Sequence, residues 1–245
     1  MKDGFVKVAA ATPEIRLADC NENGEQIARA IDAAQAQGAK VIVFPELCLT
    51  GYTCGDLFLQ DLLLRAAEEA LRCVMEQTAD KDILCLVGLP LRRGSMLYNC
   101  AAVFCRGELL GVVPKRNIPN YSEFYELRHF SPAGEGIEWI TLAGQEAPFG
   151  QNLLFCCREL PELVVAAEIC EDLWVPQSPS IRHAAAGATI LANLSASDET
   201  IGKSDYRRML VRAQSAKLVC GYLYADAGEG ESTTDLVFSG HNLIV

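Results

Sequence analysis

The order of elements in the first 46 residues limits the possible folds more than any other feature of the sequence. Residues 5–11 form a short apolar run that predicts a strand. Residues 25–37 repeat apolar side chains at helical spacing, and Asn21 or Asn23 can cap this helix. Residues 41–44 form a second apolar run that predicts another buried strand. A strand, a helix and a strand at this spacing predict a β-α-β unit, and therefore an α/β protein.

The rest of the chain continues this alternation. Further strands are predicted at residues 83–89, 97–104, 109–113, 152–157, 163–168, 189–193, 220–225 and 236–245. Two of them surround Arg106-Gly107 and predict an antiparallel hairpin. Helices are predicted at residues 57–76 after an Asp56 cap, at about 178–186, and at 203–217 with Met209, Leu210 and Ala213 on the apolar side. Residues 117–130 are predicted as loop and short helix, and residues 135–150 as loop and edge strand.

Length and charge limit the class of protein further. The 245 residues contain no repeat or interior linker, so we expect one domain over residues 1–245. A net charge of -11 argues against nucleic acid or an anionic membrane as a partner. Charges interrupt every apolar run and the first 20 residues lack a signal-peptide pattern, so we expect a cytoplasmic protein. The chain stops inside an apolar segment at Val245, and we expect it to be a fragment of a longer protein.

Eleven cysteines are scattered along the chain without a C-x-x-C pair or a neighbouring histidine. The adjacent pair Cys156 and Cys157 has unfavourable geometry for a disulfide. In a cytosolic chain most of these thiols are predicted to be reduced and buried, and one of them to be chemically special.

Three predicted strands end on reactive side chains. Glu46 follows residues 41–44, Lys115 follows residues 109–113, and Cys170 follows residues 163–168. Strand ends of an α/β fold converge on one crevice, so these residues can share a site. Glu46 can accept the thiol proton of Cys170, and Lys115 can stabilise the oxyanion formed when sulfur attacks a carbonyl or nitrile carbon.

The acids beside Cys170 have different expected roles. We expect Glu168 to be structural, whereas the backbone N–H of Glu171 can assist Lys115 in stabilising an oxyanion. A cysteine–histidine dyad is the weaker alternative, because His129, His183 and His241 lie in no recognisable motif. The sequence also lacks H-E-x-x-H, G-x-x-x-x-G-K-[ST] and G-x-G-x-x-G, so it predicts neither a metal nor a phosphate site.

Three longer blocks carry a resemblance to a known family. They are F-P-E-L-C-L-T-G-Y around Glu46, P-K-R-N-I-P-N-Y-S-E-F-Y-E around Lys115, and E-I-C-E-D-L-W around Cys170. In this order they resemble the signature blocks of the nitrilase superfamily, over essentially the whole chain. More narrowly, G-Y-T-C-G-D-L-F, N-Y-S-E-F-Y-E and C-E-D-L-W-V-P resemble the amino-terminal glutaminase domains of glutamine-dependent NAD synthetases.

The resemblance implies a four-layer α-β-β-α sandwich and an amidase with a Glu-Lys-Cys triad. Carried over, Glu46 is the general base, Lys115 the oxyanion stabiliser, Cys170 the nucleophile and Glu126 the acid that positions the lysine. The pocket for L-glutamine would draw on Tyr52, Tyr121, Phe124, Glu171, Trp174 and Ser197. Trp174 stands where relatives often have Phe, and Ser195 remains an alternative to Ser197.

The resemblance also implies a partner domain and an assembly. Ammonia released from glutamine would pass to a carboxy-terminal NAD synthetase domain, which uses ATP and Mg to amidate nicotinic acid adenine dinucleotide. The present 245 residues contain no phosphate-binding loop, so no cofactor is expected within them. Family members pair, so a homo-oligomer is expected. The alternatives are a stand-alone ω-amidase or carbamoylase of nitrilase fold, and an inactive nitrilase-like assembly scaffold.

Overall fold

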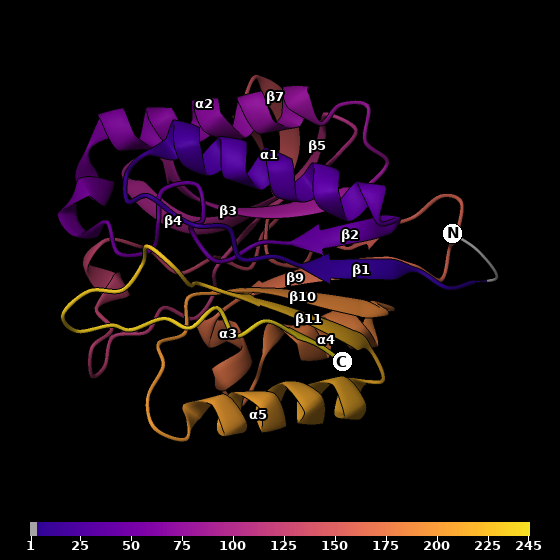
Figure 1. Cartoon of the computed structure of the whole chain (residues 1–245). Helices are drawn as coiled ribbons and strands as arrows, with labels where there is room; N and C mark the ends of the chain where they lie inside the picture. The colour runs from indigo at the N-terminus through magenta and orange to yellow at the C-terminus, as the bar shows by residue number, and fades with distance from the viewer. Residues whose placement is uncertain (1–3) are drawn as a thin grey trace.

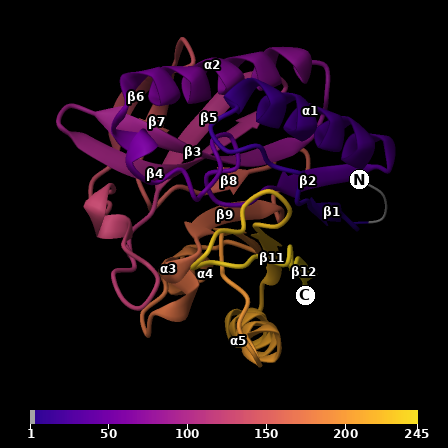
Figure 2. The same cartoon turned by 60° about the vertical axis from the view of Figure 1, so that its left-hand side comes forward.

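The computed structural model describes residues 4–245. Two β-sheets are stacked face to face, and helices cover both outer faces (Figure 1). The helices α1 (Cys20–Ala36) and α2 (Asp61–Gln77) cover the first sheet. Three helices cover the second sheet: α3 (Glu171–Trp174), α4 (Pro179–Ala185) and α5 (Lys203–Leu218). The predicted four-layer α-β-β-α sandwich is confirmed, and Figure 2 shows α1 and α2 on one outer side and α5 on the other.

The first sheet combines parallel and antiparallel pairs. Its strands lie in the order β1 (Lys7–Ala10), β2 (Ala39–Val43), β3 (Leu84–Arg93), β4 (Met96–Cys105), β5 (Glu108–Pro114), β7 (Gln145–Phe149) and β6 (Glu138–Leu142). The strands β1, β2 and β3 run parallel, which confirms the predicted β-α-β unit. The strands β4 and β5 form the predicted antiparallel hairpin, and β6 and β7 form a second one at the sheet edge.

The second sheet is built around three parallel strands. Its order is β12 (Leu243–Ile244), β11 (Gly221–Asp226), β10 (Ile190–Ser195), β9 (Val164–Ile169) and β8 (Phe155–Cys156). The strands β9, β10 and β11 are parallel, while β8 and β12 pair antiparallel at the edges. Two short 3-10 helices, Gly55–Leu59 and Glu126–Arg128, lie in the connections that follow β2 and β5.

Burial on both faces of each sheet explains the continuous apolar runs of the sequence. In β2, Val41 and Val43 point between the sheets, where they pack with the inner face of β9. Ile42 and the following Phe44 point the other way, into the core under α1 and α2. A strand with two buried faces needs no polar alternation, so periodicity alone does not reveal which side faces which layer.

The cap predicted for the first helix is wrong. The helix begins at Cys20, and the side chain of Asp19 accepts a hydrogen bond from the Glu22 backbone N–H. Asn23 is instead fully buried and bridges two loops. Its side chain binds Arg16 N and O at 2.8 and 2.9 Å and donates to Leu49 O at 3.1 Å. The loop that carries Leu49 therefore depends on a residue that resembles an ordinary cap in sequence.

The second predicted helix is interrupted. Residues Gly55–Leu59 form a 3-10 turn, the chain extends at Gln60, and α2 starts at Asp61. Asp56 caps nothing, because its carboxylate accepts hydrogen bonds from Arg128 at 2.7 and 2.9 Å.

The apolar side predicted for the last helix is only partly correct, because Leu210 packs against the core whereas Met209 and Ala213 are exposed. Met209 is 59% exposed, whereas Arg207 on α5 is completely buried. The guanidinium of Arg207 finds several acceptors inside the protein, which makes burial of its charge possible. At the end of the chain, only Leu243–Ile244 of the predicted strand 236–245 pairs with β11, because residues 227–242 form a long loop.

We predict that Asn23→Ala lowers the free energy of unfolding by about 2 kcal/mol, because it leaves the buried Leu49 carbonyl without its donor. Asn21→Ala is the matched control, since Asn21 is exposed on the same helix and should change stability by less than about 0.5 kcal/mol. Urea unfolding measures both. Equal losses in the two variants would contradict the bridging role of Asn23.

Candidate active site

The three reactive residues lie at one end of the sandwich. Glu46 follows β2, Lys115 follows β5 directly, and Cys170 stands between β9 and α3. Two backbone hydrogen bonds join the ends of β2 and β9 to β10: Glu46 N donates to Ser195 O at 3.3 Å, and Cys170 N donates to Leu194 O at 2.9 Å. Residues from both sheets therefore meet in the crevice that the sequence predicted.

The loop that carries Glu46 lies directly against β3. A Cβ atom at Gly88 would stand 2.3 Å from Leu47 N, a separation at which the backbone would have to move. The Leu49 N–H donates to Gly88 O at 3.1 Å across the same contact. The absence of a side chain at Gly88 therefore lets Glu46 reach the space between the sheets.

Lys115 lies between two carboxylates. Its Nζ is 2.5 Å from Glu46 Oε1, 2.8 Å from Glu126 Oε1 and 3.0 Å from Glu126 Oε2. Lys115 and Glu46 are completely buried, and Glu126 is 6% exposed. Burial alone would lower the pKa of Lys115, but Glu126 and Glu46 raise it well above its usual range. The lysine is therefore a fixed cation in this site.

Glu46 is a carboxyl group that can hold a proton near neutral pH. Burial raises its pKa to about 8, against the opposing effect of Lys115. Asn99 Nδ2 donates to Oε1 at 2.6 Å, and the Ala196 backbone N–H donates to Oε2 at 3.1 Å. These bonds fix the orientation of both oxygens. A buried carboxyl with this pKa suits proton transfer in both directions.

Cys170 occupies a strained turn between a strand and a helix. Its φ of 43° lies in the left-handed region, which residues other than glycine rarely adopt. Its backbone N–H also donates to Asn193 Oδ1 at 3.2 Å. Burial and the nearby charge of Glu46 raise the pKa of the thiol well above its usual range, whereas Lys115 lowers it. The resting thiol is therefore protonated and requires a base before it can react.

Asp172 ties the Cys170 turn to the segment after Lys115. Its carboxylate accepts hydrogen bonds from Ile169 N at 3.1 Å and from Asn117 N and Nδ2 at 2.9 and 2.8 Å. Glu168 lies further from the site and accepts hydrogen bonds from Ser178 Oγ, Ser180 N and the Tyr222 hydroxyl. These contacts agree with the structural role expected for Glu168.

A pocket of about 430 Å³ opens beside Cys170. Five of the six residues predicted for the substrate pocket line it: Tyr121, Phe124, Glu171, Trp174 and Ser197. The Tyr121 hydroxyl donates to Glu171 Oε2 at 3.0 Å. Within residues 4–245, none of the three histidines lines this pocket, so the structure does not favour the cysteine–histidine alternative.

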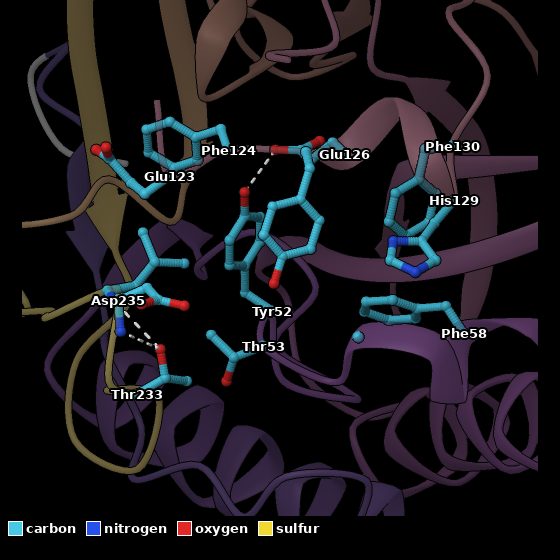
Figure 3. A pocket seen from close by; sticks show the side chains of 13 residues that line it. Tyr52, Thr53, Phe58, Glu123, Phe124, Glu126, His129, Phe130, Thr233 and Asp235 are labelled. Carbon is cyan, nitrogen blue, oxygen red and sulfur yellow. Dashed lines mark hydrogen bonds between the residues drawn. The ribbon is translucent and has the colours of Figure 1, made fainter. Parts of the chain in front are cut away.

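The sixth predicted residue, Tyr52, does not line this pocket. Its hydroxyl donates to Glu126 Oε1 at 2.7 Å, the contact drawn as a dashed line in Figure 3. It lines a separate cavity of about 70 Å³ together with Phe58, His129 and Phe130. The structure thus brings Tyr52 to Glu126, and the two cavities share Glu123 and Phe124 as lining residues.

Lys203 is a pocket residue that the sequence reasoning missed. It is the first residue of α5, its Nζ binds Asp198 Oδ1, and it lies 5.5 and 5.4 Å from the ring centroids of Phe124 and Trp174. A lysine in the first turn of a helix is unfavourable for the helix dipole. That placement was the signal available in the sequence.

Arg207 hydrogen-bonds to the segment of the pocket wall that contains Ser197. Its guanidinium donates to Ser197 O at 3.4 Å, to Ser197 Oγ at 3.3 Å and to Asp198 O at 3.0 Å. Asp226 Oδ1 accepts from Ser197 N at 2.8 Å. Ser195 is fully buried and donates to Asn193 Oδ1, so of the two serines only Ser197 faces the pocket.

Other features bear on cofactors and environment. Among residues 4–245, no group of three or more His, Cys, Asp or Glu side chains could hold a metal ion. All eleven cysteines are free, and Cys156 is the exposed one. In the same part of the chain, no helix combines the length and apolarity needed to cross a membrane.

Known proteins resemble the chain over nearly its whole length. The family profile described as Carbon-nitrogen hydrolase matches residues 7–237. A protein of Mycobacterium tuberculosis named glutamine-dependent NAD(+) synthetase is 46% identical over 241 residues, which is 98% of this chain and 36% of that protein. The protein of the same name from Aquifex aeolicus is 31% identical and is covered over 38% of its length. The chain thus spans little more than a third of these relatives.

Solved structures agree. A glutamine-dependent NAD(+) synthetase from Cytophaga hutchinsonii superimposes with a TM-score of 0.87 at 30% identity, over 98% of this chain and 38% of that one. An amidase of Nesterenkonia AN1 from the nitrilase superfamily has a TM-score of 0.75 at 20% identity, over 98% of this chain and 82% of that one. At that identity the second likeness concerns the fold alone.

We predict that alkylation of Cys170 by iodoacetamide accelerates with pH by about tenfold per unit from pH 5.5 to 7.5, below the pKa of about 8 of Glu46. The reason is that the pKa of the buried thiol lies well above 9, so the reactive thiolate fraction keeps rising over this range. Mass spectrometry of the peptide that contains Cys170 measures the rate, with the urea-unfolded chain as the control. A plateau below pH 7.5 in the folded chain would show a thiolate already formed and contradict this account.

Proposed function

Because the chain belongs to the carbon-nitrogen hydrolase family, we propose that it is the glutamine-hydrolysing domain of a glutamine-dependent NAD synthetase. The proposal is supported by the relatives of that name, which match 98% of the chain at up to 46% identity. The site supplies the chemical support, since a thiol, a buried carboxyl and a fixed cation lie at one end of the sandwich.

The first half of the reaction forms a thioester. Glu46 takes the thiol proton while Cys170 Sγ attacks the side-chain amide carbon of L-glutamine. The Lys115 ammonium and the backbone N–H of Glu171 stabilise the oxyanion. The carbon–nitrogen bond then breaks, and Glu46 returns its proton to the leaving nitrogen, which departs as ammonia. The pKa of about 8 for Glu46 suits a group that must accept and return a proton.

The second half restores the enzyme. Glu46 takes a proton from water, whose oxygen attacks the thioester carbon, and the oxyanion is again held by Lys115. The carbon–sulfur bond breaks, the proton returns to Cys170, and glutamate leaves. Through both halves Glu126 keeps the Lys115 ammonium in place, at 2.8 and 3.0 Å from its two oxygens.

The opposite charges in the pocket are the observation that carries the substrate assignment. Free glutamine bears an α-carboxylate and an α-ammonium, and the pocket offers the Lys203 ammonium and the Glu171 carboxylate to these groups. The rings of Phe124 and Trp174 form the apolar wall, and Ser197 adds a hydroxyl. A simple uncharged amide would bring no charged group to Lys203 or Glu171, which would keep only their partners Asp198 and Tyr121.

The remaining steps concern parts of a longer protein. We propose that ammonia passes to a carboxy-terminal synthetase domain, which uses ATP and Mg to convert nicotinic acid adenine dinucleotide to NAD. No cofactor is assigned to residues 1–245, which we propose act in the cytoplasm as part of a homo-oligomer.

Ammonia release from L-glutamine, L-asparagine and propionamide tests the substrate. We expect L-glutamine to be preferred, and Cys170→Ser to lose activity by about a thousandfold or more. Lys203→Met should raise the KM for glutamine by about tenfold or more, since it removes a charged contact, and should leave hydrolysis of propionamide unchanged.

Lys217→Met is the matched control, because Lys217 is exposed on the same helix. Much faster hydrolysis of propionamide than of glutamine would favour the stand-alone ω-amidase. Absence of hydrolysis of any amide, by this chain and by the full-length protein, would favour the inactive scaffold.

A further inference from the structure

A buried carboxylate that the proposed reaction does not use lies in the loop after β11. Glu231 is 1% exposed. Its oxygens accept hydrogen bonds from Tyr52 N at 2.9 and 3.0 Å and from Thr53 N at 3.3 Å. The Thr53 hydroxyl donates to Glu231 Oε2 at 3.3 Å. Within residues 4–245 it forms no ion pair, so two backbone N–H groups and the Thr53 hydroxyl compensate its charge.

This arrangement is a small anion-binding turn filled by the protein's own side chain. Two successive backbone N–H groups converge on one carboxylate, as they do where turns bind external anions. Burial raises the pKa of Glu231, while the donors of Tyr52 and Thr53 lower it. A buried acid without a counter-ion is destabilising unless its hydrogen bonds are complete. Glu231 therefore fixes the backbone at residues 52–53.

The loop that carries Glu231 is fixed in position against the segment that precedes α1. The Ile15 N–H donates to Glu229 O at 3.1 Å. Gly230 has a φ of 92°, and a Cβ atom there would stand 1.8 Å from Ile15 O. Only glycine allows the backbone to approach so closely. Glu231 is thus anchored to the segment before α1 and reaches across to the loop after β2.

The backbone segment that Glu231 binds carries Tyr52, which is linked to Lys115 through Glu126. Tyr52 extends from it towards Glu126, as Figure 3 shows, and its hydroxyl donates to Glu126 Oε1 at 2.7 Å. The same oxygen is 2.8 Å from Lys115 Nζ. Phe238, from the loop after β11, packs edge-on against the Tyr52 ring at 6.0 Å.

We propose that Glu231 is a positioning residue for the amide-hydrolysing site. It fixes the Tyr52 backbone so that the tyrosine hydroxyl holds Glu126, and through Glu126 the Lys115 ammonium. The inference rests on the roles proposed for Lys115 and Glu126. It extends the site to a third loop, which joins the C-terminal part of the chain to the catalytic lysine.

The alternative is that Glu231 only staples two loops together and stabilises the fold. Stapling would lower the unfolding temperature without changing the chemistry of the folded protein. Positioning requires a change at Cys170, because a displaced Lys115 lowers the thiol pKa less effectively. The alkylation rate of Cys170 therefore separates the two roles, and it does so without any assumption about the substrate.

The first experiment compares Glu231→Gln with the wild-type chain at pH 8 and at a temperature where both are folded. The amide NH₂ of glutamine cannot accept the converging backbone donors, so the turn should shift. We expect alkylation of Cys170 by iodoacetamide to slow by about tenfold, and kcat for glutamine to fall by a similar factor with little change in KM. Glu229→Gln is the matched control, since Glu229 is exposed in the same loop.

A double-mutant cycle with Tyr52→Phe tests the route. If Glu231 acts through the tyrosine hydroxyl, the two substitutions together should slow alkylation no more than Tyr52→Phe alone. Multiplied losses would overturn the route. An unchanged alkylation rate in Glu231→Gln, with only a lower unfolding temperature, would overturn the proposal in favour of stapling.

Two further arms keep the test decisive. If Glu231→Gln does not fold, Glu231→Asp is used instead, because it retains the charge on a shorter side chain. We expect it to slow alkylation of Cys170 by about two- to threefold, the effect of a small shift in position. A wild-type alkylation rate in Glu231→Asp would overturn the proposal. A wrong glutaminase assignment would give a different result. No variant, nor the wild-type chain, would hydrolyse glutamine, but the differences in Cys170 alkylation among the variants would remain.

Discussion

A single buried cation determines the layout of this site. Lys115 has no exposed surface, and its ammonium contacts Glu46 at 2.5 Å and Glu126 at 2.8 Å. Taking three ionisable groups out of water is unfavourable unless each is paired and hydrogen-bonded. Asn99 and the Ala196 N–H donate further hydrogen bonds to Glu46, and the Tyr52 hydroxyl donates one to Glu126. The sandwich satisfies this demand because its two sheets bring the ends of β2, β5 and β9 to one place.

The segments that support the catalytic residues, around Ser197 and Tyr52, are loops rather than strands. The Ser197 wall depends on buried Arg207, and the Tyr52 turn depends on buried Glu231. Each uses a charged side chain that is absent from the proposed bond-making steps. Such groups order the substrate pocket on one side and the lysine on the other. The long loop after β11 thereby becomes part of the catalytic end of the protein.

The main features were predictable from sequence because apolar runs stop at Glu46, Lys115 and Cys170, and strand ends of an α/β fold converge. The three long blocks added the sandwich itself. Residues whose roles depend on tertiary contacts were not predictable: Asn23 resembled a cap, and Arg207 resembled a solvated helix residue. The role of Glu231 can be recognised only when distant loops meet, whereas Lys203 shows one signal in the sequence, its unfavourable place in the first turn of a helix. The local sequence pattern predicts burial and the type of secondary structure. The role of a buried polar residue depends on hydrogen-bond partners that lie far away in the sequence.

Whether Cys170 is the nucleophile can be tested by acid-quench mass spectrometry of the peptide that contains it, sampled within the first turnovers after mixing with L-glutamine. We predict a γ-glutamyl thioester on Cys170, formed as ammonia appears and lost as glutamate appears. We also predict that the adduct is absent from Cys170→Ser. Steady ammonia release with no adduct on Cys170, or with the adduct on another of the eleven cysteines, would contradict this role of Cys170.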